Sequence, residues 1–174
     1  LRVDKKKKEI FNSSFLIDKN GQIVSIYDKS HLVPFGEYFP FSQFLGSINF
    51  FGKHKLLRKG FSSGNGLKVI DEISIPPFVT LICYESLFSN EIIGKIKDAK
   101  WLVNITNDAW FGKKGGPKQH LAIARMRALE NNLPLVRVAN TGISAIINKF
   151  GKVTKYIPID KRGFIDVKVN REDI

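Results

Sequence analysis

The chain has 174 residues, of which 43% are hydrophobic and 25% charged, and its formal net charge is +12. This length suits one globular unit and is too short for two full domains, and no stretch approaches the roughly 18 consecutive apolar residues of a membrane-spanning helix. The lysines are scattered along the whole sequence, which favours a compositional bias over a nucleic-acid-binding surface.

The first predicted elements form a β-hairpin. Apolar-rich runs at 13–18 and 22–27 flank Lys19-Asn20-Gly21, and Asn-Gly between two such runs is a strong hairpin signal. The second strand places Lys29 just past its end. Residues 30–66 are rich in Gly, Pro, Ser and aromatic side chains without a sustained period, so we expect a long loop, an aromatic-rich arm.

The middle of the chain predicts a strand, a helix and a second strand. Residues 78–83 are apolar without alternation, which is typical of a strand covered on both faces, and Cys83 ends this run. Residues 90–99 have isoleucines at helical spacing, and 101–105 form another buried-type strand. This alternation indicates a layered α/β or α+β fold.

A second helix follows a Gly-rich loop at 107–116. Pro117 suits its first turn, the helix is expected to end near 131–132, and one face carries Leu121, Ala124, Ala128 and Leu129. Four further strands are predicted, at 135–139, 143–147, 152–157 and 164–169.

Cys83 is the only cysteine, which excludes an internal disulfide and a cysteine-based zinc site. A thiol after an apolar run is usually an inert core residue. A residue at the carboxyl end of a buried strand, however, lies where open α/β folds place their sites, and the following turn offers N–H groups such as that of Tyr84 to an oxyanion. A nearby ammonium, such as that of Lys29, would favour the reactive thiolate.

Four ordered motifs carry a family resemblance. They are YDKSHLVPFGEY at 27–38, ICYE at 82–85, TNDAWFG at 106–112, and a fourth that runs from QH at 119–120 through RMRALE at 125–130 to ANTGIS at 139–144. Together they resemble apolipoprotein N-acyltransferases, which are members of the nitrilase or carbon–nitrogen hydrolase superfamily. The resemblance covers residues 27 to about 147, and four motifs in the right order are far more specific than any one of them.

The resemblance implies an αββα sandwich whose N-terminal part is missing, with residues 1–174 as a partial domain of this kind. It also implies a Glu-Lys-Cys triad, in which Lys29 and Cys83 take the second and third roles and the general-base glutamate lies upstream of Leu1. Glu37 matches a second glutamate that supports the site, and Glu85 matches the glutamate two residues after the nucleophile. No metal or organic cofactor is implied.

The implied reaction transfers a fatty acyl group from a membrane phospholipid to the N-terminal diacylglyceryl-cysteine of apolipoproteins, through a thioester on Cys83. The implied location is the periplasmic side of a bacterial inner membrane, with no nucleic-acid partner. The aromatic-rich arm holds half of the fourteen phenylalanines, and lysines lie nearby, so we expect it to contact lipid. Trp110 and Phe111 are candidate acyl-chain contacts.

Two alternatives remain open from the sequence. A soluble nitrilase-type amidase would use the same cysteine and lysine with water as the acceptor, and an inactive module would keep the fold without the general base. His31 and His120 fall within the motifs but lie far apart in the chain, which favours hydrogen bonding or support of the site over metal binding.

Overall fold

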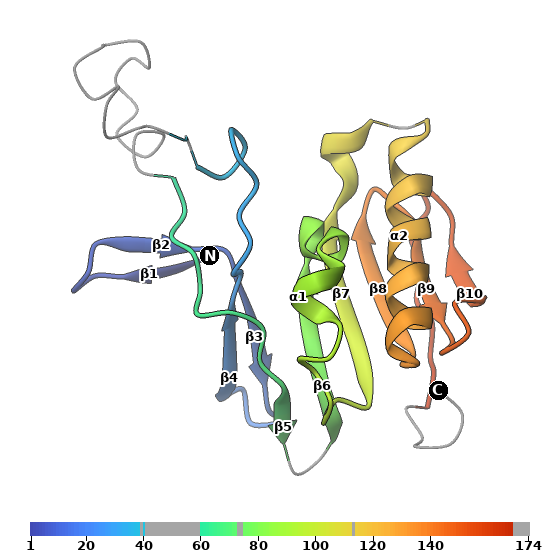
Figure 1. The fold of residues 1–174 in the computed structure, drawn as a ribbon, viewed down its shortest axis with the longest axis horizontal. Coiled ribbons are helices and arrows are strands. Elements are labelled where there is room, and N and C mark those ends of the chain that lie inside the picture. Colours follow the sequence, from blue (N-terminus) through green and yellow to red (C-terminus); the bar gives the residue numbers. More distant parts are fainter. Residues whose placement is uncertain (39, 41–59, 73–74, 113, 169–174) are drawn as a thin grey trace. The chain divides into compact units, whose positions relative to one another are not determined.

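The computed structural model describes residues 1–38, 40, 60–72, 75–112 and 114–168 (Figure 1). The chain divides into two compact units, Leu1–Gly66 and Leu67–Ile174.

The described residues of the first unit form two β-hairpins. Strand β3 (Ser13–Ile17) pairs antiparallel with β4 (Ile23–Asp28), which confirms the predicted hairpin and places Lys29 directly after its second strand. Asp18 closes the turn by accepting hydrogen bonds from the N–H groups of Asn20 (2.9 Å) and Gln22 (2.8 Å).

The other hairpin, β1 (Arg2–Asp4) with β2 (Glu9–Phe11), was not predicted. Its turn is the lysine run, where the Asp4 carboxylate accepts hydrogen bonds from the N–H groups of Lys6 (3.0 Å) and Lys7 (3.1 Å). The strands are three residues each, too short to produce a recognisable alternation.

Most of the aromatic-rich arm lies outside the described residues, so its lipid contact stays a prediction. The described parts of 30–66 contain no helix or strand. Backbone hydrogen bonds tie the returning chain to the hairpins, from Ser62 N–H to the Ile10 carbonyl and from Gly64 N–H to the Lys29 carbonyl, both 2.8 Å.

The second unit is built on a six-stranded sheet in the order β10-β9-β8-β7-β6-β5 (Figure 1). The three central strands are parallel neighbours, and the outer pairs are antiparallel. The strands are β5 (Ile70–Glu72), β6 (Ile75–Ile82), β7 (Trp101–Asn107), β8 (Leu135–Asn140), β9 (Ser144–Ile147) and β10 (Val153–Ile157).

Five of these strands were predicted in nearly these positions, and β5 was missed. The strand predicted at 164–169 is wrong for 164–168, which form no strand. Phe164, which suggested it, is 86% exposed and so gains no packing from a neighbouring strand.

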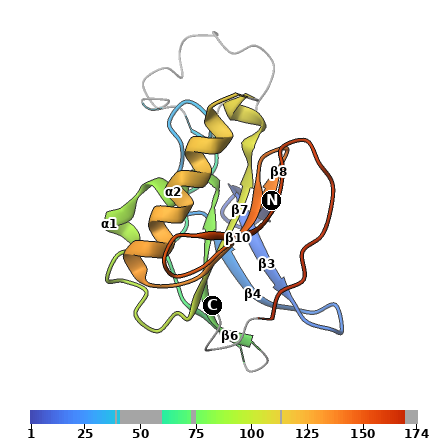
Figure 2. The same ribbon diagram turned by 90° about the vertical axis from the view of Figure 1, so that its right-hand side faces the viewer.

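Both helices of this unit lie over the same face of the sheet (Figures 1 and 2). The helix predicted at 90–99 is much shorter than expected, because α1 covers only Ser89–Ile92 and Gly94 then adopts a φ of +77°. Ile92 and Ile96 are nevertheless buried. The predicted strand, helix, strand arrangement is therefore confirmed, with a shorter helix.

Helix α2 (Gly116–Asn131) has Pro117 in its first turn and ends near 131–132, as predicted, and Asn132 closes it in a left-handed conformation. Leu129, predicted on the buried face, is 48% exposed. The predicted burial of Ala124 and Ala128 is confirmed, and Pro117, His120 and Arg127 are buried on the helix as well. Two polar residues on a packed face are unusual, and His120 belongs to the site described below.

The core of the second unit joins the sheet to these helices. It contains Val79 and Leu81 of β6, Leu102 of β7 and Leu135 of β8, packed against Ile92, Ala124 and Ala128. Among the described residues, no helix is long and apolar enough to cross a membrane.

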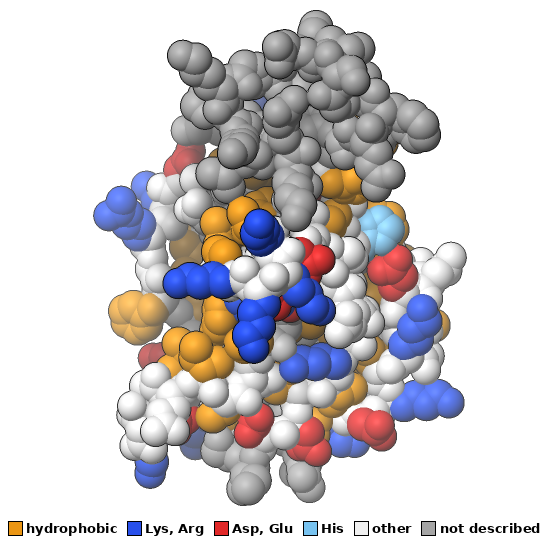
Figure 3. All heavy atoms as spheres, turned by 90° about the vertical axis from the view of Figure 1, so that its left-hand side faces the viewer, with side chains coloured by type: hydrophobic (Ala, Val, Ile, Leu, Met, Phe, Trp, Pro, Cys, Tyr) orange, Lys and Arg blue, Asp and Glu red, His pale blue; other side chains and the backbone are white. Residues whose placement is uncertain are grey.

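On the face drawn in Figure 3, Lys and Arg side chains are interspersed with acidic and hydrophobic ones.

Candidate active site

Cys83 lies at a sharp turn between β6 and the 3-10 helix η2 (Cys83–Leu87). Its φ is +53°, in the left-handed region that a residue with a Cβ rarely adopts. Such a conformation costs about 1–3 kcal/mol and persists only where the surroundings hold it. The turn leaves the thiol partly exposed at the carboxyl end of a buried strand, as the sequence predicts.

Glu85 and Tyr84 shape this turn. Glu85 is 3% exposed, and its Oε2 accepts a hydrogen bond of 2.7 Å from the Ile82 N–H, which closes the turn around Cys83. The Tyr84 ring stacks on Phe111 with centroids 6.1 Å apart. It also meets Phe88 edge-on at 6.1 Å, so an aromatic cluster flanks the nucleophile.

Phe111 and Trp110 belong to the short helix η3 (Asp108–Phe111), which joins β7 to α2. Phe111 contacts His120 edge-on, with centroids 5.1 Å apart. Trp110 is 79% exposed, a large apolar side chain presented to its surroundings.

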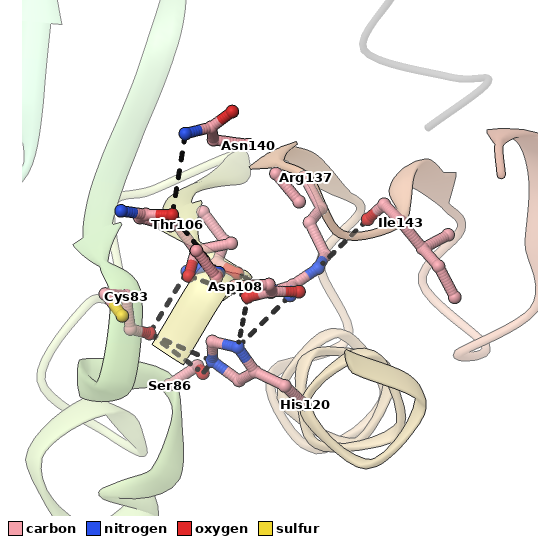
Figure 4. A network of polar contacts seen from close by, with 12 residues as sticks. Cys83, Ser86, Thr106, Asp108, His120, Arg137, Asn140 and Ile143 are labelled. Atoms are coloured by element: carbon pink, nitrogen blue, oxygen red, sulfur yellow. Dashed lines mark hydrogen bonds and ion pairs between the residues drawn. The ribbon is translucent and has the colours of Figure 1, made fainter. Parts of the chain in front are cut away.

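A buried polar network lies directly beneath Cys83 (Figure 4). His120 Nε2 lies 3.2 Å from the Cys83 carbonyl oxygen, and its Nδ1 lies 2.9 Å from Asp108 Oδ1. Asp108 Oδ2 accepts from Arg137 at 2.7 Å. Arg137 also donates to Asn104 Oδ1, and the Asn104 amide donates to the Leu81 carbonyl at 3.0 Å.

Two ionised groups in this network have shifted pKa values. Burial raises the pKa of Asp108, but the hydrogen bond from His120, the charges of Arg137 and His120, and the hydrogen bond from Thr106 outweigh burial and hold that pKa below its ordinary value. Burial lowers the pKa of Arg137, opposed by Asp108 and by the negative charge of Cys83.

In the first unit, Lys29 and Glu37 form a buried ion pair. Lys29 is 1% exposed, and its Nζ lies 2.6 Å from Glu37 Oε2. The same oxygen accepts from the Val33 N–H at 2.8 Å, and Glu37 Oε1 accepts from the Asn12 amide at 3.0 Å. Hydrogen bonds therefore hold both oxygens of the Glu37 carboxylate. This carboxylate in turn fixes the position of the Lys29 ammonium.

Asp28, the last residue of β4 and the one before Lys29, is also held by hydrogen bonds. Arg2 donates two hydrogen bonds to the Asp28 carboxylate, at 2.9 and 2.6 Å, and Ser13 donates a third at 2.6 Å. Gly64 runs so close that a Cβ there would lie 2.2 Å from the Asp28 carbonyl oxygen. Only glycine fits at this approach.

The structure thus places the predicted residues in two groups. Lys29 and Glu37 are brought together in the first unit, and His31, which lies between them in the motif, is partly buried. The second unit holds Cys83, Tyr84, Glu85, Trp110 and Phe111. The pairing of Lys29 with Cys83 and the role of each residue stay predictions.

Sequence reasoning missed Asn12, Asn104, Asp108 and Arg137 as contributors. Asp108 lies within the TNDAWFG motif, and Asn104 and Arg137 are polar residues inside apolar strands. A polar side chain at a buried strand position requires a hydrogen-bond partner, and this was the available signal.

Residues 2–174, and so both parts of the site, match the carbon-nitrogen hydrolase family. The chain belongs to that family.

Two relatives within this family have the same name. The chain is 44% identical over 156 residues to apolipoprotein N-acyltransferase of Rhodopseudomonas palustris, a match that covers 90% of this chain. It is 42% identical over 159 residues to the enzyme of that name from Bradyrhizobium diazoefficiens, which covers 91% of the chain. The match spans only 29% of the length of each relative.

Solved structures of carbon-nitrogen hydrolases have the same fold. Nit3 of Saccharomyces cerevisiae, a member of branch 10 of the nitrilase superfamily, superposes with a TM-score of 0.65 at 18% identity over 92% of this chain and 54% of that one. A carbon-nitrogen hydrolase from Helicobacter pylori gives 0.66 at 19% identity, over 89% and 55%. The predicted nitrilase-like α/β fold is therefore confirmed.

Proposed function

We propose that this chain is the nucleophile-bearing part of an apolipoprotein N-acyltransferase, which moves a fatty acyl group from a membrane phospholipid to the N-terminal diacylglyceryl-cysteine of apolipoproteins. The observation that carries the proposal is the left-handed turn at Cys83, which presents a thiol at a strand end, within a chain whose relatives have this name.

In the first half-reaction, the Cys83 thiolate attacks the carbonyl carbon of the phospholipid ester. A carbon–sulfur bond forms, the carbon–oxygen bond breaks, and the departing lysophospholipid oxygen takes a proton from the general acid. Backbone N–H groups in the first turn of η2, such as that of Tyr84, suit the oxyanion that develops, because the first turn of a helix has donors without partners inside the helix. The resemblance assigns the acid–base glutamate to no residue of this chain.

In the second half-reaction, the α-amine of the lipoprotein cysteine attacks the thioester. A carbon–nitrogen bond forms, the Cys83 thiolate leaves, and the same acid–base group accepts the amine proton. Dividing the transfer into two covalent steps predicts ping-pong kinetics. The resemblance assigns to Lys29, which Glu37 holds, a fixed positive charge that stabilises the oxyanion.

The aromatic residues near Cys83 support an apolar acyl donor. Tyr84 is next to the nucleophile in the chain and stacks on Phe111, and Trp110 is largely exposed. We assign these three side chains to contact with the acyl chain or the lipid surface. The location at the periplasmic side of the inner membrane is part of the proposal, because the donor is a membrane lipid.

The test is intact-mass analysis of the purified protein after incubation with phospholipid vesicles. We expect a mass increase of one acyl chain that hydroxylamine removes and that Cys83→Ala lacks. Cys83→Ser is a second control, since any ester it forms would be more resistant to hydroxylamine. If no acyl chain is added while a small amide is hydrolysed in a Cys83-dependent manner, the protein is an amidase and the proposal is wrong.

A further inference from the structure

Hydrogen bonds to the carbonyl oxygen of Cys83 hold the backbone of this residue in place. Three donors converge on that oxygen, namely His120 Nε2 at 3.2 Å, Ser86 Oγ at 3.3 Å and the Asn104 amide at 3.5 Å. A left-handed conformation at a residue with a Cβ requires such external support, because it is unfavourable on its own. The carbonyl is therefore the point at which the rest of the unit can fix the direction of the thiol.

Both ring nitrogens of His120 have hydrogen-bond partners. A carbonyl oxygen can only accept, so the contact with Cys83 requires a hydrogen on Nε2. Nδ1 faces Asp108 Oδ1 at 2.9 Å and an Arg137 nitrogen at 3.1 Å. When Nδ1 accepts from Arg137, the neutral ring carries its hydrogen on Nε2, and a protonated ring donates from both nitrogens. The neutral ring with its hydrogen on Nδ1 would instead donate to Asp108 and accept from Ser86 Oγ, which lies 3.2 Å from Nε2.

His120 itself is fixed by a closed ring of contacts (Figure 4). From His120 the ring runs through Asp108, Arg137 and Asn104 and returns to the Cys83 carbonyl. All four side chains are at least nine-tenths buried. The ring joins β7, η3, α2 and β8, so four elements of the second unit together hold the nucleophile turn.

Two further contacts make the ring rigid. Arg137 Nε donates to the Ile143 carbonyl at 3.2 Å, and Thr106 donates to Asp108 Oδ1 at 3.0 Å. At Gly142, a Cβ would lie 2.1 Å from Asp108 Oδ2, so the loop after β8 closes directly onto the carboxylate. The aspartate that orients His120 has no room to change its own position.

We propose that His120 is a positioning residue for the nucleophile, whose Nε2–H holds the Cys83 carbonyl and thereby keeps the thiol in its reactive direction, with Asp108, Arg137 and Asn104 holding His120. The inference rests on the proposed function only in taking Cys83 as the nucleophile. His120 acts through the backbone and is not expected to contact substrate.

The test compares His120 variants in the purified protein by the rate at which iodoacetamide alkylates Cys83, followed by intact mass. His120→Leu removes the donor, and we expect the rate to fall about tenfold, as for a lost hydrogen bond of ordinary net strength. His120→Gln places an amide nitrogen near the position of Nε2, and we expect it to restore most of the rate. His120→Asn, whose shorter amide corresponds to Nδ1, should not.

Ala128→Gly is the matched control for loss of stability alone. It lies on the same helix, is fully buried in the core and has no polar side-chain atom that could join the ring. We expect it to lower the melting temperature with less than about a twofold change in alkylation rate, since glycine weakens a helix without touching Cys83. If Ala128→Gly slows alkylation as much as His120→Leu, or if Gln and Asn behave alike, the positioning role is refuted.

A second measurement separates this inference from the proposed function. In the acyl-transfer assay we expect His120→Gln to retain the wild-type KM for phospholipid and His120→Asn to lower kcat at unchanged KM. If the wild type forms no acyl-thioester, the proposed function fails while the alkylation rates still decide the role of His120. Should His120→Leu not accumulate as folded protein, the Gln and Asn pair decides alone.

Discussion

Arg137→Met tests the energetics of the buried network beneath Cys83. The Arg137 side chain is fully buried, and its guanidinium pairs with an equally buried Asp108 carboxylate at 2.7 Å. Removing one partner of such a pair leaves an uncompensated charge and costs about 3–5 kcal/mol. The Asn104 and Ile143 oxygens lose a donor as well, which adds to the loss.

The assay is the thermal unfolding midpoint of the purified protein. At roughly 2–4 °C per kcal/mol for a domain of this size, the expected decrease is about 6–20 °C. Arg125→Met is the matched control, because Arg125 is exposed and donates to one neutral acceptor, the Gly151 carbonyl at 2.8 Å. Its loss should cost no more than about 1 kcal/mol.

The double variant Arg137→Met/Asp108→Leu should recover part of the decrease, because it contains no unpaired buried charge. The reasoning is refuted if Arg137→Met melts within about 3 °C of the wild type. It is also refuted if the decreases of the two single variants simply add in the double variant.

Three further predictions concern the two held carboxylates and the loop above them. Gly142→Ala should destabilise the protein strongly, because the new Cβ would lie 2.1 Å from Asp108 Oδ2, whereas Gly115→Ala, with nothing within 4 Å, should be nearly neutral; equal melting temperatures would contradict this. Glu37→Gln leaves the Lys29 ammonium without its counter-charge and should cost about 3–5 kcal/mol, checked by thermal unfolding, and a loss under about 1 kcal/mol would show that the pair is not buried in solution. Because the folded-state pKa of Asp108 is lowered, its contribution to stability is fully present above the unfolded value of about 3.9 and disappears as the pH falls through the folded value. Melting temperatures measured between about pH 5 and 2 should therefore decrease more steeply for the wild type than for Asp108→Asn, and parallel curves would be evidence against the lowered pKa.

Much of the fold could be predicted from local sequence. The Asn-Gly turn fixed the β3–β4 hairpin, the apolar run before Cys83 predicted β6, and Pro117 marked the start of α2. These features depend on residues that are close in the chain, whose conformational preferences act before any tertiary contact forms. The prediction failed at 90–99, where the chain leaves the helix at Ile93, with ψ of 125°, just before the left-handed Gly94, although the isoleucine spacing continues.

The residues of the site also divide into those that the sequence identifies and those that only the tertiary structure brings together. The sequence by itself determined which residues carry the motifs, Lys29 and Glu37 in one and Cys83 with Glu85 in another. Only the tertiary structure decided that Glu37 closes on a buried Lys29 and that His120 reaches the Cys83 carbonyl 37 positions away in the chain. The physical reason is that a polar side chain is buried only where distant parts of the chain supply its partners, and local patterns do not specify those partners.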